Sequence, residues 1–160
     1  MKLCLLYFHG SCLAIETSYV VESVRNPQVT RVPLTPKSLM GLINLRGNIF
    51  PVFSATSLFL KAKSAQKAAI KGERWEELCL VLKVAESFLG VLVDRVDLQT
   101  LAETSSEPQK ISAESSFIEF GQLFEQRLFE GGRQISIVKI PVLAQYLKKN
   151  LASRALREAR

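Results

Sequence analysis

A chain of 160 residues, of which 48% are hydrophobic, is long enough to bury the core of one domain without a metal ion or disulfides. Its three cysteines lack the spacing of metal ligands and its single histidine leaves no partner for zinc chemistry, so we expect reduced thiols in a cytoplasmic protein. The formal charge of +6 is concentrated in residues 148–160, which contain five basic residues and one acid, so the rest of the surface is ordinary.

The chain opens with a predicted hairpin. Residues 3–8 and 12–15 are short apolar runs on either side of a turn at Gly10-Ser11. The first run is shorter than the apolar region of a signal peptide, and no apolar run in the chain reaches the length of a membrane span. We therefore expect a first strand and no direct membrane insertion.

The next segments are less regular. Residues 17–24 fit one face of a helix or a kinked strand equally well. Residues 29–32 alternate as a short strand does, and a proline-containing linker leads to an expected turn of helix at residues 37–40.

Residues 41–52 predict a second hairpin. Two apolar runs flank a tight turn in which Gly47 is free to take a positive φ, and Arg46 lies at the tip. Pro51 lacks a backbone donor and therefore indicates a sheet edge or a strand end. Ser54 is the predicted N-cap of a following helix.

The second half contains a lysine-rich segment, residues 61–77, which we expect to be a solvated loop or frayed helix. Residues 78–84 and 88–93 are continuous apolar runs, typical of strands buried on both faces. A long surface loop is expected at residues 103–116.

The last strands are predicted at residues 117–124 and 135–140, joined by a connection that turns at Gly131-Gly132. A helix begins at Pro141. Nine or ten short strands with one clear helix at the end indicate a mostly β fold, built as small barrels or sandwiches.

The sequence offers little catalytic chemistry. His9 has no cysteine, serine or carboxylate constellation around it, and no phosphate-binding loop is present. Asp94 and Asp97 lie three residues apart, but a solvated pair of aspartates explains them better than a cation site. We expect neither an enzyme nor a cofactor.

Glu22 and Arg46 are charges placed within apolar sequence. An unpaired charge in an apolar setting is costly, so we expect each to have a partner, and the two could pair with each other. The alternative, which the sequence leaves equally open, is that both are simply exposed.

A small β-barrel nucleic-acid-binding protein is an alternative function, suggested by the net positive charge and short strands. Trp75 is the only tryptophan available to stack on a base, and most of the excess charge is in the last residues. We therefore expect no nucleic-acid partner.

The stretch Gly41-Leu42-Ile43-Asn44-Leu45-Arg46-Gly47 followed by Pro51-Val52 resembles the signature of the CheW family of bacterial chemotaxis adaptors. Val20-Val21-Glu22-Ser23-Val24 and Thr30-Arg31-Val32-Pro33 precede it in the family's order, and Gly90-Val91-Leu92-Val93-Asp94-Arg95-Val96 resembles its Gly-x-x-Val-Asp-x-Val strand. The resemblance extends over residues 3–147.

This resemblance implies two small five-stranded β-barrel subdomains, SH3- or OB-like, with a C-terminal helix. It implies one domain over residues 1–147, followed by a basic helix extension or tail at 148–160. Family members are adaptors that join the cytoplasmic tips of chemoreceptors to the regulatory domain of a CheA-type histidine kinase. They are cytoplasmic and are recruited to membrane-associated receptor arrays.

The resemblance also assigns residues. The implied receptor-binding positions are Val20, Glu22, Gly41 and Arg46, and the implied structural positions are Asn44, Gly47, Pro51, Gly90 and Asp94. Two departures stand out, because Phe53-Ser54 and Val138-Lys139 replace an Asp-Leu and a Leu-Asp that are frequent in the family. Together with the lysine-rich segment, they suggest an accessory or specialised chemosensory system.

Overall fold

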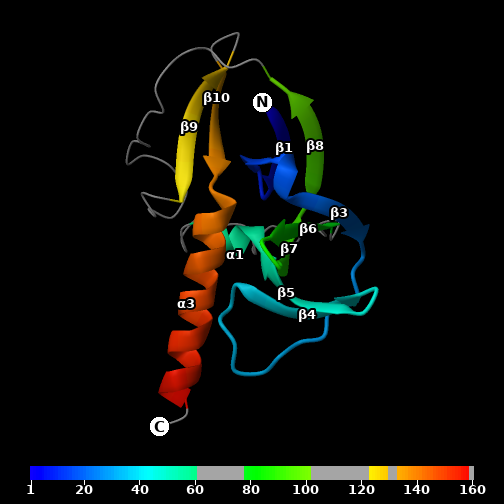
Figure 1. Cartoon of the computed structure of the whole chain (residues 1–160), viewed down its shortest axis with the longest axis vertical. Helices are drawn as coiled ribbons and strands as arrows, with labels where there is room; N and C mark the ends of the chain where they lie inside the picture. Colours follow the sequence, from blue (N-terminus) through cyan, green and yellow to red (C-terminus); the bar gives the residue numbers. More distant parts are fainter. Residues whose placement is uncertain (61–77, 102–122, 130–132, 159–160) are drawn as a thin grey trace.

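The computed structural model describes residues 1–60, 78–101, 123–129 and 133–158, and within them ten strands form two five-stranded sheets (Figure 1). Sheet A has the strand order β8-β1-β2-β10-β9 and sheet B the order β3-β6-β7-β5-β4. Sheet A consists of β8 (Arg95–Thr100), β1 (Lys2–Phe8), β2 (Ser11–Glu16), β10 (Arg133–Val138) and β9 (Phe124–Phe129). Sheet B consists of β3 (Val20–Arg25), β6 (Leu78–Val84), β7 (Ser87–Val93), β5 (Asn48–Ser54) and β4 (Leu39–Leu45).

The mostly β fold with five strands per unit and a final helix is confirmed. In the part of the chain that the structure describes, however, β8 does not pair with β9, nor β3 with β4, so the sheets are open and not closed barrels. One parallel pairing occurs in each sheet, between β10 and β2 and between β5 and β7. The other pairings are antiparallel.

The largest core lies between the two sheets, where apolar side chains of both meet the helices α1 (Ala55–Phe59) and α3 (Ile140–Glu158). The rings of Phe8 and Phe59 are 5.8 Å apart at its centre. A second cluster fills the other face of sheet B. Ser54 is the N-cap of α1, as predicted, because its hydroxyl accepts a hydrogen bond of 3.3 Å from the Ser57 N–H.

Several sequence predictions in the N-terminal half were wrong in detail. The first turn is formed by His9 and Gly10, both with positive φ, and Ser11 already belongs to β2. Within the described residues, 29–32 form a single isolated bridge, between Thr30 and Leu42, in place of the expected strand. In place of the expected helical turn at residues 37–40, a single turn closed by a hydrogen bond of 2.9 Å from the Leu39 N–H to the Pro36 carbonyl leads directly into β4. The ambiguous residues 17–24 are a short 3₁₀ helix, η1 (Thr17–Tyr19), followed by strand β3.

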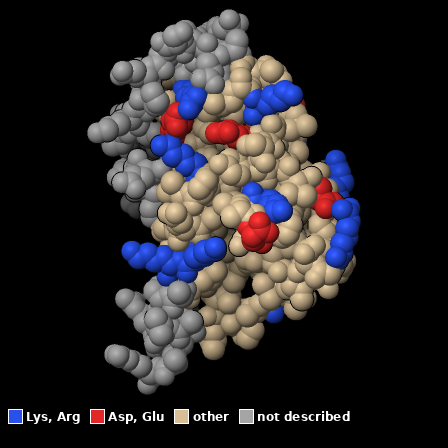
Figure 2. All heavy atoms as spheres, viewed as in Figure 1, with Lys and Arg blue, Asp and Glu red and all other residues tan. Residues whose placement is uncertain are grey.

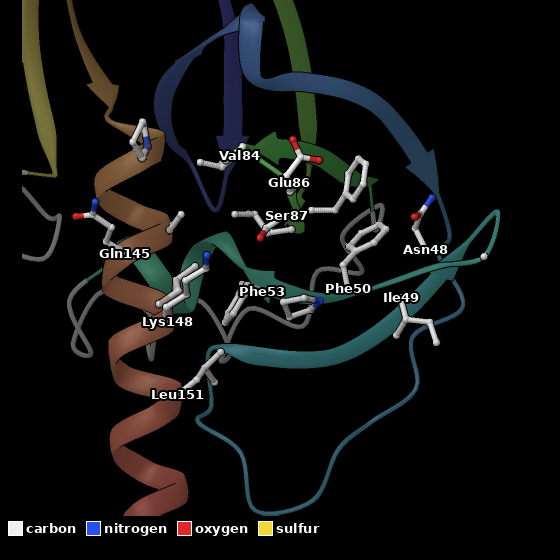
Figure 3. A pocket seen from close by; sticks show the side chains of 18 residues that line it. Asn48, Ile49, Phe50, Phe53, Val84, Glu86, Ser87, Gln145, Lys148 and Leu151 are labelled. Carbon is white, nitrogen blue, oxygen red and sulfur yellow. The ribbon is translucent and has the colours of Figure 1, made fainter.

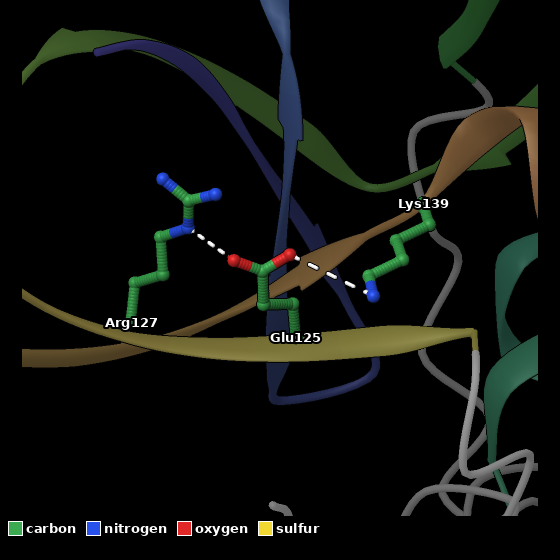
Figure 4. A network of polar contacts seen from close by, with 3 residues as sticks. All are labelled: Glu125, Arg127 and Lys139. Atoms are coloured by element: carbon green, nitrogen blue, oxygen red, sulfur yellow. Dashed lines mark hydrogen bonds and ion pairs between the residues drawn. The ribbon is translucent and has the colours of Figure 1, made fainter. Parts of the chain in front are cut away.

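The end of the chain also differs. A strand was predicted at residues 117–124, but β9 begins at Phe124. The next was predicted at residues 135–140, but β10 covers Arg133–Val138. Strand β9 carries charged side chains. Figure 4 shows Glu125 on β9 between Arg127 and Lys139, with its Oε2 3.8 Å from the lysine Nζ. Because these charged residues interrupt the apolar pattern of β9, the sequence of this edge strand resembles that of a polar loop, and the strand was not predicted. The predictions for residues 61–77 and 103–116, and most of 117–124, lie outside the described residues.

Candidate functional site

The candidate site is centred on an ion pair between the two edges of sheet B, which curls enough to bring them together. Arg46 Nη2 lies 3.0 Å from Glu22 Oε2, and the side chains are 77% and 26% exposed respectively. Glu22 belongs to β3, and Arg46 lies in the turn between β4 and β5. Because β3 and β4 are the two outer strands of the sheet, the pair joins its opposite edges. The sequence-based pairing of Glu22 with Arg46 is observed, although Arg46 is also largely exposed.

The hairpin that presents Arg46 is built by its turn. Arg46 has a φ of 53° and Gly47 a φ of 85°, the signs of a two-residue type I′ turn that matches the twist of the strands. Asn44 Oδ1 accepts a hydrogen bond of 3.0 Å from the Gly47 N–H. Arg46 is thus held at the tip by a fixed backbone, and not by a flexible loop.

Pro51 lies inside β5, so the predicted strand end is wrong, whereas the other alternative, a sheet edge, fits because β5 pairs with β7 only from Val52 onward. The partner of Pro51 on β4 is Leu42, whose N–H and C=O exchange hydrogen bonds of 2.8 Å with Thr30 on the far side. Leu42 and Pro51 are therefore a non-hydrogen-bonded pair, in which the missing proline donor costs the β4–β5 ladder nothing.

Gly41 is buried, because Thr30 crosses over it. A Cβ at this position would lie 2.2 Å from the Thr30 carbonyl oxygen and 2.8 Å from Val29 Cγ1. The φ of Gly41 is +148°, a value that also favours glycine. Gly41 thus permits a close approach of two backbones, and its own surface is covered.

Val20 precedes Glu22 on β3, with a register shift between them. Val20 is half-buried and packs against the core between the sheets, whereas its neighbour Val21 is 49% exposed. The site that the structure assembles is therefore the Glu22–Arg46 pair, and Val20, on the same strand as Glu22, faces the core on the opposite side of the sheet. Gly41 is set apart beneath Thr30.

Gly90 and Asp94 have structural roles. A Cβ on Gly90 would lie 2.7 Å from Cys79 Sγ and 2.9 Å from Val52 Cγ2, inside the cluster on sheet B. Asp94 Oδ2 accepts a hydrogen bond of 2.7 Å from the His9 N–H. Burial raises the pKa of Asp94 above its usual value, although the His9 hydrogen bond opposes the shift. Asp94 therefore anchors the β1–β2 turn. The prediction of a solvated aspartate at this position was wrong.

The sequence reasoning missed the apolar side chains that the structure leaves on the surface. Ile49 is 67% exposed and Leu98 is 69% exposed. Ile49 stands in an apolar run that resembled core, yet strand alternation places it on the opposite face from the buried Phe50. The alternation of side chains along β5 could have shown in advance that Ile49 and Phe50 lie on opposite faces.

Within the described residues, no three His, Cys, Asp or Glu side chains gather as a metal site. None of the helices described is both long enough and apolar enough to span a membrane. Basic and acidic side chains are interspersed on the face shown in Figure 2. Trp75, the one tryptophan that the nucleic-acid alternative could use for base stacking, lies outside the described residues.

The fold consists of two open five-stranded sheets and a C-terminal helix, and the sequence motifs follow one another along it. Residues 3–145 match the family model of the CheW-like domain. The chain belongs to this family, which confirms the resemblance seen in the sequence.

Individual relatives agree. The chemotaxis protein CheW of Helicobacter pylori (strain ATCC 700392 / 26695) is 30% identical over 109 residues, covering 62% of this chain and 61% of that protein. The chain thus aligns with less than two thirds of the length of this relative. The crystal structure of the scaffolding protein TtCheW from Thermoanaerobacter tengcongensis has a TM-score of 0.64 and 19% identity, and the match covers 86% of this chain and 88% of that one, which shows a shared fold.

Proposed function

We propose that this chain is a non-enzymatic adaptor that couples chemoreceptor tips to a CheA-type histidine kinase in a chemosensory array. Membership of the CheW-like family supports an adaptor, and the matched relatives are named as a chemotaxis protein and a scaffolding protein. The proposal includes cytoplasmic localisation with recruitment to receptor arrays, and one CheW-like domain over residues 1–147. Helix α3 continues through residue 147 to Glu158, so the basic segment begins as helix.

The observation that carries the receptor contact is the Glu22–Arg46 pair. Arg46 is mostly exposed and held by a rigid turn, so its guanidinium is available to a partner while Glu22 fixes its direction. Val20 lies on the same strand as Glu22, but its side chain faces the core between the sheets, so we expect it to hold the β3 backbone in place and to act on the receptor contact indirectly. Gly41 contributes indirectly, by letting Thr30 lie close to β4.

Titration with purified partners from the same genome tests this proposal. We expect saturable binding of a receptor signalling domain and of the regulatory domain of the CheA-like kinase. Arg46→Glu should weaken receptor binding about tenfold or more while leaving kinase binding unchanged. An exposed ion pair contributes only about 0–1 kcal/mol to stability, so the melting temperature should change little. Lys37→Glu, at an exposed lysine that precedes β4 and is not part of the ion pair, is the control for charge reversal.

A charge swap separates two roles for Arg46. If the pair only fixes the backbone, Glu22→Arg combined with Arg46→Glu should restore binding; if Arg46 contacts the receptor, binding stays weak. The receptor surface is rejected if Arg46→Glu binds the receptor as the wild type does. Absence of binding to both partners at about 50 μM, a weak affinity on the usual scale, would overturn the adaptor function itself.

A further inference from the structure

A groove of about 670 Å³ lies between α3 and sheet B, on a part of the molecule that neither Glu22 nor Arg46 lines (Figure 3). Its walls are residues 48–51 of β5, residues 84–89 around the β6–β7 turn, and one side of α3. The volume is in the range of sites that hold several large side chains of a ligand.

The groove exists because two neighbouring strands pair over only part of their length. β5 and β7 are paired in parallel from Val52 and Gly90 to Ser54 and Leu92, and the preceding residues of both strands line the groove. The floor is aromatic, with the rings of Phe50 and Phe88 5.9 Å apart. Phe50 is buried, whereas Phe88 is half-buried and leaves part of its ring accessible, which favours an apolar partner face.

The wall contributed by α3 is one helical face. Ala144, Lys148 and Leu151 line the groove at spacings of three and four residues, which place them on the same side of the helix. Figure 3 shows Lys148 and Leu151 directed from α3 toward Phe53. Ala144 is short, so a partner can approach the helix closely there.

Among the described residues, two lysines and one glutamate lie in or beside the groove. Lys148 lines the groove and is exposed, and Lys83 lies beside it with its Nζ 5.7 Å from the centre of the Phe88 ring. Glu86 is the acid among the lining residues. A partner with acidic side chains along its flank would complement the two lysines.

The backbone of β5 argues for a helix as the occupant. A strand added to β5 would need regular backbone donors along the edge that faces the groove. Pro51 lines the groove and, because its pair with Leu42 is a non-hydrogen-bonded one, its nitrogen is on that edge and has no hydrogen to donate.

We propose that this groove binds an amphipathic helix of a partner protein, with an apolar stripe against Ile49, Phe88 and Leu151 and acidic residues beside Lys148. The exposed Ile49 at the entrance extends the apolar contact. This site is separate from the surface of the Glu22–Arg46 pair, and it stands independently of the receptor contact proposed there.

A synthetic peptide of about 18 residues, roughly 27 Å as a helix, tests the proposal. It carries leucines at helical spacing and glutamates on the flanks; one control replaces the glutamates by lysines and another scrambles the leucine positions. Titrated into the isotope-labelled full chain, the acidic peptide should bind saturably and shift the NMR signals of residues 48–53 and 144–151. Both controls should bind at least about tenfold more weakly.

Matched variants localise the binding. Lys148→Glu should weaken it about tenfold, whereas Lys37→Glu should not. Ile49→Ser should weaken it, and Leu34→Ser, at a residue that is 77% exposed elsewhere, is its control. Both groove positions are at the surface, so the variants should fold, which their melting curves check.

The proposal is overturned if the acidic peptide does not bind, if the scrambled peptide binds equally, or if Lys148→Glu behaves as Lys37→Glu does. It is also overturned if sedimentation shows that the chain self-associates through this groove, since the occupant is then a second copy. Arg46→Glu should bind the peptide normally, which separates failure here from failure of the adaptor function.

Discussion

Replacing Gly41 with alanine tests the contact that positions residues 29–30 over β4. The new Cβ would lie 2.2 Å from the Thr30 carbonyl oxygen, and the neighbour in conflict is backbone, which cannot rotate away. Such overpacking costs about 1–3 kcal/mol. The φ of +148° adds strain of about 1–3 kcal/mol for a residue with a side chain.

Taking about 3 kcal/mol for the two effects together, the melting temperature should fall by about 6–12 °C for a chain of this length. Urea denaturation followed by circular dichroism measures the change in the free energy of unfolding. Gly47→Ala is the matched control, because Gly47 has a φ of +85° but nothing within 4 Å of a built Cβ. Its cost should be about 1 kcal/mol. Equal losses in the two variants would refute the clash with Thr30.

Three further predictions concern groups in the core and at its margin. Gly90→Ala should lower the free energy of unfolding by about 1–3 kcal/mol, and adding Cys79→Ala should recover part of this loss because the Sγ at 2.7 Å is removed; full additivity would contradict the contact. Asp94 has a raised pKa, so it binds its proton more tightly in the folded state, and its contribution to stability is lost as the pH rises through that raised value. Compared with Asp94→Asn in urea titrations between about pH 3 and about pH 6, the wild type should lose more stability with rising pH, and parallel curves would count against the shift. Burial raises the thiol pKa of Cys4 and Cys79 to about 11, so at pH 8 only Cys12 should react quickly with a thiol reagent before unfolding, and rapid reaction of all three would exclude this packing.

Much of the fold could be predicted because its signals are local. The apolar runs at residues 78–84 and 88–93 became β6 and β7, and Gly47 occupies the tight turn expected of it. The Glu22–Arg46 pair could be anticipated because isolated charges in apolar sequence need partners. The roles of Glu22 and Arg46 in receptor binding stay predictions.

Other features depend on contacts that no local pattern contains. Gly41 looked like a surface position, and only the path of Thr30 above it reveals the burial. Pro51 suggested a sheet edge or a strand end, and only the paired strands show that it lies inside β5 with its nitrogen on the side that β7 leaves unpaired. Strand β9 was missed because Glu125 and Arg127 satisfy each other on an edge strand. The groove needs α3 to lie across β5, a relation between segments about 100 residues apart.

The β4–β5 hairpin bears on both proposed surfaces at once. Arg46 is tied to β3 across the sheet, and Gly47 with the residues that follow it forms a wall of the groove. A single backbone turn therefore lies between the two sites, and any movement of that turn acts on both. Linkage then demands symmetry: if filling the groove changes the affinity at Arg46 by some factor, occupancy at Arg46 changes the affinity of the groove by the same factor. A protein with two sites coupled in this way would pass a change in occupancy from one partner to the other, in addition to holding both.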